Sequence, residues 1–261
     1  MMKQYVVDAF TNVIFKGNPA AVCILDAWLE DDLLQAIAKE NNLSETAFAV
    51  STGENQYHLR WFTPTDEIDL CGHATLATAF VLFNYYQAGA ETITFDTLSG
   101  KLIVAKSGDR YQLDLPSYDL KEVAVTDEMA NVLGVRPLEA YMGRDLVCVL
   151  PEEKFVTEYV PNSGKLATLD GMLVHITAKG TEYDCISRSF APKIGILEDP
   201  VCGSGHCHLV PLWSKKLSKT HLTAFQASER SGVLYCDYLG ERTRISGEAA
   251  LYSIAELQIG N

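Results

Sequence analysis

Hydrophobic and polar positions alternate along most of the chain in a pattern typical of short strands. Runs rich in β-branched and aromatic residues lie at 5–10, 20–25, 57–63, 92–96, 101–106 and 110–115, which predicts six strands in the first half. Asp31–Asn41 carries leucine, isoleucine and alanine at helical spacing, which predicts an amphipathic helix. Ala74–Tyr86 is apolar on nearly every face and predicts a helix buried on all sides. Gly203–Leu217 is its expected counterpart, although Pro211 should kink that helix or delay its start.

The second half of the sequence repeats motifs of the first half in the same order. Four pairs of segments match at offsets of 125 to 132 residues: 20–25 with 145–150, 60–64 with 188–192, 69–77 with 199–207, and 98–104 with 230–236. The ordered series predicts an internal duplication. We therefore expect an α/β (α+β) fold of two pseudo-symmetric lobes, each a barrel-like curled β-sheet around a central buried helix. The two helix starts should face a shared cleft.

The duplication predicts where the lobes divide. We expect residues 1–116 to form the first lobe and 125–248 the second, with the link near Pro116–Glu128. The last segment, 249–261, contains the strand-like "AALYSIAELQI" and should return to complete the first lobe. Superposition of the lobes should bring Cys71 onto Cys202.

The amino-acid composition and net charge limit the classes of partner that the chain is expected to bind. Of its 261 residues 48% are hydrophobic, and the formal net charge is −13, which disfavours nucleic acid and anionic membranes as partners. The N-terminal segment has too short an apolar run for a signal peptide. The seven cysteines are an odd, scattered set, so we expect a reduced, cytoplasmic protein. "CGSG" is too short for a nucleotide fingerprint, and no cofactor is predicted.

The segment "EDPVCGSGHC" at 198–207 suggests chemistry at a helix start. Unpaired N–H groups and the helix dipole favour an anion there, so we expect the backbone around Gly203, Ser204 and Gly205 to bind substrate carboxylate oxygens. Gly72 begins the equivalent helix, after Cys71. A helix start also lowers the pKa of a thiol, but Asp199 near Cys202 and Asp69 near Cys71 should oppose this.

A metal site is also conceivable in the same segment. Cys202 and His206 share a helix face at a spacing of four residues. Zinc requires further convergent ligands, and only His73 on the other lobe is a candidate. We therefore predict no metal.

Six motifs occur in an order similar to that of a known family: "DAF" at 8–10, "GNPAAV" at 17–22, "NLSETAF" at 42–48, "FTP" at 62–64, "CGHAT" at 71–75 and "EDPVCGSGH" at 198–206. Over essentially the whole chain the sequence resembles the PhzF-like (phenazine biosynthesis-like) proteins of the diaminopimelate-epimerase superfold. The resemblance implies cofactor-independent isomerisation of a small carboxylate-bearing metabolite in the cleft between the lobes, and a homodimer.

The resemblance also assigns roles to individual residues. Glu45 corresponds to the acid/base that moves the substrate proton, and His73 and Asp199 line the site. Ser44, Gly72 and Ser204 fall where the family binds polar groups of the substrate. Without the resemblance, Glu45 would be read as a solvated glutamate, His73 as a buried core histidine and Asp199 as a helix cap.

Two alternatives remain open at the level of sequence. The epimerase branch of the superfold uses two cysteines at the helix starts, and Cys71 and Cys202 occupy those positions here, although "CGHA" stands where that branch has "CGNG". The chain would then be an amino-acid epimerase or racemase. The other alternative is a non-catalytic binding protein with the same fold.

Overall fold

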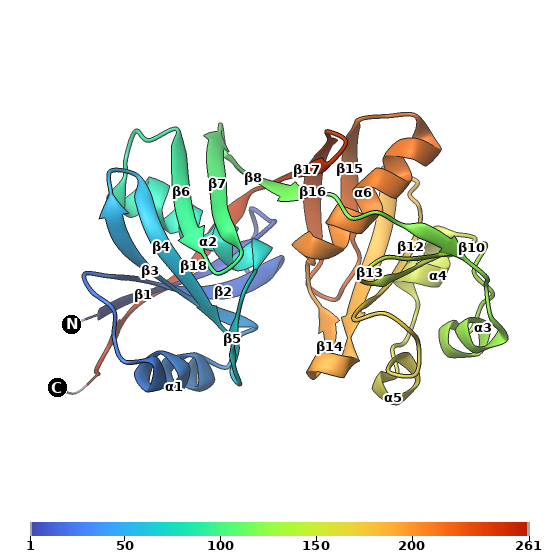
Figure 1. The fold of residues 1–261 in the computed structure, drawn as a ribbon, viewed down its shortest axis with the longest axis horizontal. Coiled ribbons are helices and arrows are strands. Elements are labelled where there is room, and N and C mark those ends of the chain that lie inside the picture. The colour runs from blue at the N-terminus through green and yellow to red at the C-terminus, as the bar shows by residue number, and fades with distance from the viewer. Residues whose placement is uncertain (1, 260–261) are drawn as a thin grey trace. The chain divides into compact units, whose positions relative to one another are not determined.

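Two units of mixed α/β structure make up the chain, which a computed structural model describes from residue 2 to residue 259 (Figure 1). The first unit ends at Asp114 and takes up the chain again at Ser246, and the second is Leu115–Ile245. The chain leaves the first unit within β8 (Arg110–Pro116) and returns to it within β17 (Arg242–Gly247).

The first unit is mostly strand, with one amphipathic and one buried helix. Its elements are β1 (Met2–Ala9), β2 (Asn18–Leu25), α1 (Asp31–Asn41), β3 (Glu45–Gly53), β4 (Gln56–Phe62), β5 (Glu67–Ile68), α2 (Gly72–Val81), the π-helical turn η1 (Leu82–Tyr86), β6 (Thr92–Thr97), β7 (Gly100–Ser107), β8, and β18 (Ala249–Leu257). The six strands and the two helices predicted for the first half are all present. Strand β18 pairs antiparallel with β1, as predicted for the C-terminal segment.

Helix α2 is buried because its sequence leaves no polar face. Ala74, Leu76, Ala77 and Ala79 are fully buried, and the helix packs against β1, β2 and β3. The hydroxyl of Thr78 donates to the backbone carbonyl of Ala74 (2.7 Å), which satisfies a polar group that has no access to water. The predicted helix over 74–86 is confirmed, but its last turn widens to the π-helical η1.

The second unit has the same kind of construction. Its elements are β9 (Lys121–Val123), α3 (Asp127–Leu133), β10 (Glu139–Met142), β11 (Leu146–Val149), α4 (Glu153–Thr157), α5 (Ser163–Leu166), β12 (Val174–Lys179), β13 (Cys185–Ala191), the 3₁₀ turn η2 (Pro192–Ile194), β14 (Ile196–Asp199), α6 (Gly203–Leu217), β15 (His221–Gln226), β16 (Gly232–Tyr238) and β17. The predicted link over 116–128 contains β9, which pairs antiparallel with β10.

Strand pairing repeats between the units. In the first unit β2 pairs parallel with β3, β3 antiparallel with β4, β4 antiparallel with β5 and parallel with β6, and β6 antiparallel with β7. In the second unit β11, β12, β13, β14, β15 and β16 pair in the same series of directions. Helices α2 and α6 both follow the short strand of their series. The order and direction of pairing therefore support the predicted duplication.

The repeated Arg-X-Phe motif makes the same contact in both units. Arg188 forms a bidentate ion pair with Glu198, with both N–O distances 2.7 Å. Arg60 pairs with Glu67 at the same two distances. Each guanidinium also lies over the ring of the phenylalanine two residues later. The sequence repeat therefore gives the same arginine–glutamate ion pair and arginine–phenylalanine contact in both units.

Pro211 lies inside α6 without delaying its start, contrary to one of the two effects expected of it. A proline has no N–H to donate to the carbonyl four residues earlier, which here belongs to Cys207. The backbone N–H of Tyr118 donates to that carbonyl instead (3.0 Å). Because this carbonyl has a donor, the helix tolerates Pro211 in its interior. The helix begins at Gly203, as the sequence pattern predicted.

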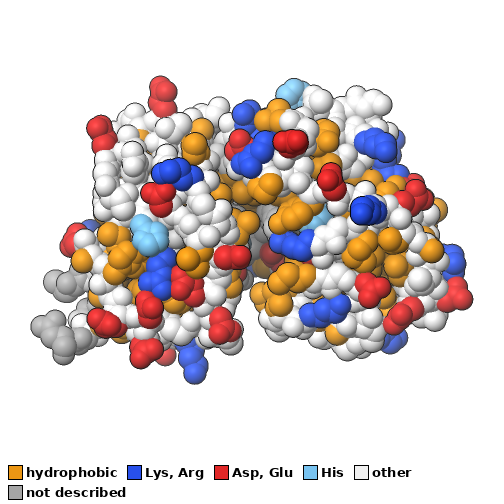
Figure 2. All heavy atoms as spheres, in the orientation of Figure 1, with side chains coloured by type: hydrophobic (Ala, Val, Ile, Leu, Met, Phe, Trp, Pro, Cys, Tyr) orange, Lys and Arg blue, Asp and Glu red, His pale blue; other side chains and the backbone are white. Residues whose placement is uncertain are grey.

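The surface carries mixed charge. On the face shown in Figure 2, lysine and arginine side chains are interspersed with aspartate and glutamate and with hydrophobic patches. No helix among residues 2–259 is long and apolar enough to span a membrane.

Candidate active site

The first unit brings Glu45 and His73 into contact. Glu45 begins β3, and His73 is the second residue of α2. His73 Nε2 lies 2.9 Å from Glu45 Oε2, and the two side chains are only 6% and 9% exposed. The distance is that of an ion pair, but the two groups are not aligned as a hydrogen bond, and neither atom has another hydrogen-bond partner. A buried carboxylate and imidazole in this relation can exchange a proton with a bound molecule.

The other ring nitrogen of His73 contacts two further residues. Asn18 Nδ2, at the start of β2, is 3.1 Å from His73 Nδ1. Cys71 Sγ is 3.5 Å from the same atom. Cys71 is the N-cap of α2, so the predicted site residues Glu45, Cys71 and His73 form one buried cluster.

Burial and neighbouring charge shift the pKa values in this cluster. Burial, reinforced by the negative charge of Glu45, raises the pKa of Cys71 to about 11. We had expected Asp69 to be the opposing acid, but Asp69 is exposed and Glu45 takes that role. Burial lowers the pKa of His73, but Cys71 and Glu45 outweigh burial and raise it well above its ordinary value. The Cys71 charge contributes to this rise only as a thiolate.

The second unit places Cys202 at the start of α6. Cys202 Sγ accepts the backbone N–H of Gly205 at 3.3 Å and caps the helix. Burial and the adjacent Asp199 carboxylate raise the pKa of this thiol well above its ordinary value. Asp199 ends β14, and its Oδ1 accepts the N–H of Val201 (3.1 Å). Asp199 therefore stabilises the turn before α6. The N-cap of the helix, which the sequence also suggested for Asp199, is Cys202.

The first turn of α6 is tightly packed. A Cβ atom at Gly205 would come within 2.7 Å of the His175 ring, so only glycine fits this position. Because the N–H of Gly205 is taken by Cys202, the predicted anion site there rests on Gly203 and Ser204. The Ser204 hydroxyl lies 3.2 Å from Arg144 Nη2.

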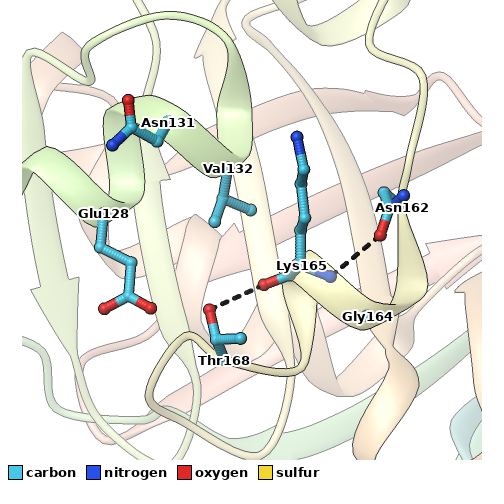
Figure 3. A pocket seen from close by; sticks show the side chains of 7 residues that line it. All are labelled: Glu128, Asn131, Val132, Asn162, Gly164, Lys165 and Thr168. Atoms are coloured by element: carbon cyan, nitrogen blue, oxygen red, sulfur yellow. Dashed lines mark hydrogen bonds between the residues drawn. The ribbon is translucent and has the colours of Figure 1, made fainter.

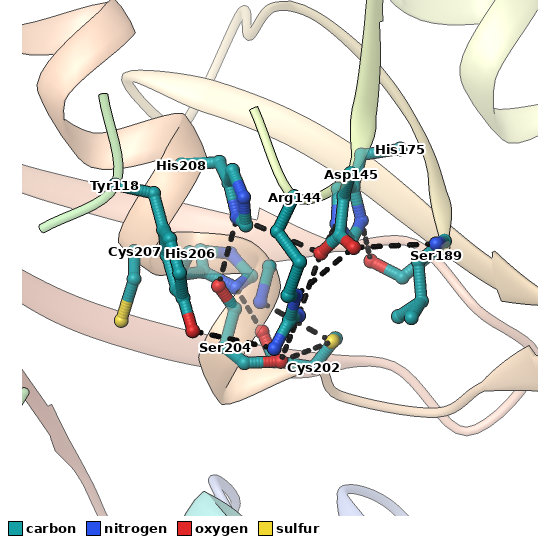
Figure 4. Close-up of polar contacts among 12 residues, drawn as sticks. Tyr118, Arg144, Asp145, His175, Ser189, Cys202, Ser204, His206, Cys207 and His208 are labelled. Carbon is teal, nitrogen blue, oxygen red and sulfur yellow. Dashed lines mark hydrogen bonds and ion pairs between the residues drawn. The ribbon is translucent and has the colours of Figure 1, made fainter. Parts of the chain in front are cut away.

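A buried polar network supports Arg144 beside this turn (Figure 4). Asp145 Oδ1 and Oδ2 accept from Arg144 Nε (3.0 Å) and Nη2 (2.6 Å). Asp145 Oδ2 also lies 3.1 Å from His175 Nε2. The guanidinium lies over the Tyr118 ring, which stacks on His208. Despite burial, the hydrogen bonds from His175 and Arg144 lower the pKa of Asp145, so the network holds a fixed guanidinium against a fixed carboxylate.

Two familiar kinds of site do not fit this network. His175 Nδ1 lies 2.9 Å from Ser189 Oγ, which completes a Ser–His–Asp series, but all three side chains are fully buried and cannot reach a substrate. Among residues 2–259, metal-ligand atoms converge in two groups, Glu45–Cys71–His73 and Asp145–His175–His208. In the second group Arg144 already holds the carboxylate and would repel a cation. The Cys202–His206 pair weighed from sequence belongs to neither group.

A separate surface pocket of about 510 Å³ lies in the second unit beside α3 and α5 (Figure 3). Its lining residues are Glu128, Asn131, Val132, Asn162, Gly164, Lys165 and Thr168. None of the predicted site residues is among them. The pocket offers a hydrophobic side chain and scattered polar groups but no pair of acid and base in contact.

The structure therefore gathers the predicted residues in two places. Glu45, Cys71, His73 and, by adjacency in the chain, Ser44 and Gly72 lie in the first unit. Asp199, Cys202 and residues 203–205 lie in the second unit. The sequence analysis missed four residues in these places: Asn18, Arg144, Asp145 and His175. Only Asn18 had a usable signal, since it lies in the "GNPAAV" motif.

Known proteins have a similar sequence or the same fold. The family model for phenazine biosynthesis-like proteins matches residues 7–254. An uncharacterized isomerase of Pseudomonas aeruginosa is 46% identical over 253 residues, covering 97% of each chain. The crystal structure of a PhzF-family protein from Enterococcus faecalis is 49% identical, covers 99% of each chain and superposes with a TM-score of 0.97. A predicted epimerase from Pseudomonas aeruginosa, 18% identical over 100% of each chain, shares the fold alone (TM-score 0.76).

These likenesses define the class of protein first. The chain has the fold of that predicted epimerase, with two units of repeated strand pairing and, in each unit, a helix that begins after a cysteine at the N-cap position. Within that class, the chain belongs to the phenazine biosynthesis-like (PhzF) family. Its relatives include proteins named as isomerases, which supports the isomerase class for this chain.

Proposed function

We propose that the protein is a cofactor-independent isomerase that moves a proton on a small carboxylate-bearing metabolite, with Glu45 as the acid/base. The observation that carries this proposal is the buried contact of 2.9 Å between Glu45 and His73. In the proposed reaction the Glu45 carboxylate removes a proton from a substrate carbon. The same proton, held on Glu45, is then returned to a different carbon, so that the substrate changes and the enzyme does not.

His73 has a supporting role in this scheme. Its Nε2 faces the Glu45 carboxylate and can share the proton that Glu45 takes up. A buried site with little water keeps the proton on this pair and prevents its loss to solvent. A closely held acid/base of this kind typically accelerates proton transfer by about 10²–10⁴-fold.

Groups in the second unit support the carboxylate class of substrate. Arg144 is held rigid by Asp145 and lies beside Ser204 in the first turn of α6, where backbone N–H groups favour an anion. We propose that Ser44, Gly72, Gly203 and Ser204 bind polar groups of the substrate, and that Asp199 acts as a further catalytic group. Gly205, whose N–H is taken by Cys202, allows the close packing of this turn.

The two-cysteine epimerase is the second candidate. It is favoured by one observation: Cys71 and Cys202 each cap a helix start, and backbone N–H groups of Ala74 and Gly205 stabilise their thiolates. Against it, the net shift of both pKa values is upward, so neither thiol is ionised near neutral pH.

An exchange experiment in deuterated water tests the proposal. The purified protein is incubated with a panel of small amino, hydroxy and unsaturated carboxylic acids, and deuterium incorporation at carbon is followed by NMR. Incorporation or a shifted double bond that is lost in Glu45→Gln supports the proposal. Binding of a panel member with neither exchange at any carbon nor a shift of a double bond would favour the non-catalytic binding protein. The homodimer and the cytoplasmic location remain predictions.

A further inference from the structure

Asn18 is a fully buried residue whose polar end faces the candidate active site. It is the first residue of β2, which pairs parallel with β3, the strand that begins with Glu45. Helix α2, which carries His73, packs on both β2 and β3. One ring nitrogen of His73 therefore contacts Asn18, at 3.1 Å, and the other contacts Glu45, at 2.9 Å.

The atoms around Nδ1 of His73 decide where its proton lies. An amide nitrogen donates hydrogen bonds and does not accept them, so Asn18 Nδ2 requires a lone pair on Nδ1. The second neighbour of Nδ1 is Cys71 Sγ. Because the pKa of Cys71 is about 11, this thiol keeps its proton near neutral pH and is also a donor, although a weak one.

We propose that Asn18 is a positioning residue that keeps the proton of a neutral His73 on Nε2, where it faces the Glu45 carboxylate. The tautomer of a histidine is set by the hydrogen bond that its other nitrogen makes. With Nδ1 occupied by donors, the ring presents an N–H to Glu45. The opposite tautomer would place a lone pair against the carboxylate and repel it.

The consequence concerns the charge of the pair. With the thiol protonated, Cys71 contributes no negative charge, and Glu45 alone favours a second proton on His73 while burial and the Asn18 amide oppose it. The pair then carries one negative charge and one shared proton, which suits a base. The catalytic meaning of this inference rests on the proposed role of Glu45, but the tautomer itself does not.

NMR of the ring nitrogens measures the tautomer directly. The full chain is labelled with ¹⁵N-histidine, and the His73 signals among the six histidines are assigned from the spectrum of His73→Gln. Near neutral pH we expect Nδ1 to resonate as an unprotonated nitrogen and Nε2 as a protonated one. A protonated Nδ1 in the wild-type protein would overturn the inference, and this result does not depend on the folding of any Asn18 variant.

Asn18→Asp provides the matched change, since it replaces the donor with an acceptor of the same shape. We expect both ring nitrogens of His73 to be protonated in this variant at the same pH. Cys71→Ala is the control, and it should leave the wild-type tautomer in place. A spectrum of Asn18→Asp identical to that of the wild type would count against the role of Asn18.

Turnover separates this inference from the proposed function. Loss of a supporting contact typically costs about 10–100-fold, so Asn18→Asp should lower kcat by that factor with little change in KM. Full activity of Glu45→Gln would refute the proposed function and leave the tautomer result intact. An inactive Glu45→Gln combined with an unchanged spectrum of Asn18→Asp would refute the inference alone.

Discussion

Cys202 lies beside Asp199, whose negative charge adds to burial in raising the pKa of the thiol. The same arrangement occurs in the first unit, where Glu45 adds to burial at Cys71. Each of the two cysteines that a thiol mechanism would need is therefore held in its protonated form. In the first unit, the carboxylate that opposes ionisation of Cys71 is Glu45, which is the other candidate base. The same contact therefore bears on both mechanisms.

Substitutions at three positions distinguish the mechanisms. Glu45→Gln keeps the size of the side chain and removes the base, so we expect turnover to fall by about 10²–10⁴-fold. Cys71→Ala and Cys202→Ala should each retain a substantial fraction of activity. The measurement is the rate at which the substrate found in the panel is converted to product, followed by NMR. A cysteine variant as inactive as Glu45→Gln would transfer the assignment to the two-cysteine epimerase.

Alkylation reports the pKa of Cys71 without a substrate. With a pKa of about 11, only about one thiol in 10⁴ is ionised at pH 7, so labelling by iodoacetamide should be slow and should accelerate up to pH 11. Glu45→Gln removes the neighbouring charge, which should lower the pKa and label Cys71 several-fold faster at pH 7.

Cys202 is the internal control for that experiment. Its acidic neighbour is Asp199, which Glu45→Gln leaves in place. Mass spectrometry of the labelled peptides should therefore show an unchanged rate at Cys202. Wild-type Cys71 that reacts at pH 7 as fast as a free thiol would contradict the shift.

The sequence predicted the helices and strands better than it predicted contacts between side chains far apart in the chain. The bounds of α1 and α6 follow from hydrophobic spacing and helix-start residues, which are local signals. The contact between Glu45 and His73 could be expected only from the family resemblance, because it joins residues 28 positions apart, one on strand β3 and the other on helix α2. Arg144 and Asp145 gave no signal, since an adjacent pair of opposite charges is common on surfaces. Burial of Asp145 is a property of the tertiary structure, and local patterns do not report it.

The duplicated ion pairs give a stability test with its own control. Arg188 is 9% exposed, pairs with Glu198 and also donates to the backbone carbonyl of Tyr159 (2.5 Å). Arg188→Met leaves a partly buried carboxylate and the Tyr159 carbonyl without their donor, so the free energy of unfolding should fall by about 3 kcal/mol. Urea denaturation followed by circular dichroism measures the change.

Arg60→Met is the matched variant in the first unit. Arg60 is 16% exposed, and its partner Glu67 is 26% exposed, so solvent compensates more of the loss. We expect a cost of about 1 kcal/mol. Equal costs at the two positions would show that burial does not govern the strength of these pairs.

His206 predicts how acid destabilises the second unit. It is fully buried in α6, its Nδ1 lies 2.8 Å from the carbonyl of Cys202, and burial lowers its pKa from 6.5 to about 4. The unfolded chain therefore binds a proton on His206 below pH 6.5, whereas the folded chain does so only near pH 4. Stability from this residue is complete above pH 6.5 and is lost as the pH falls towards 4, by up to about 3 kcal/mol.

His206→Asn keeps a donor near the position of Nδ1 and cannot be protonated, so its free energy of unfolding should fall less steeply over that range. Urea denaturation at a series of pH values measures both slopes, and His221→Asn, at an exposed position, should retain the wild-type slope. If His206→Asn followed the wild-type curve between pH 6.5 and 4, the neutral state assigned to the buried imidazole would be wrong.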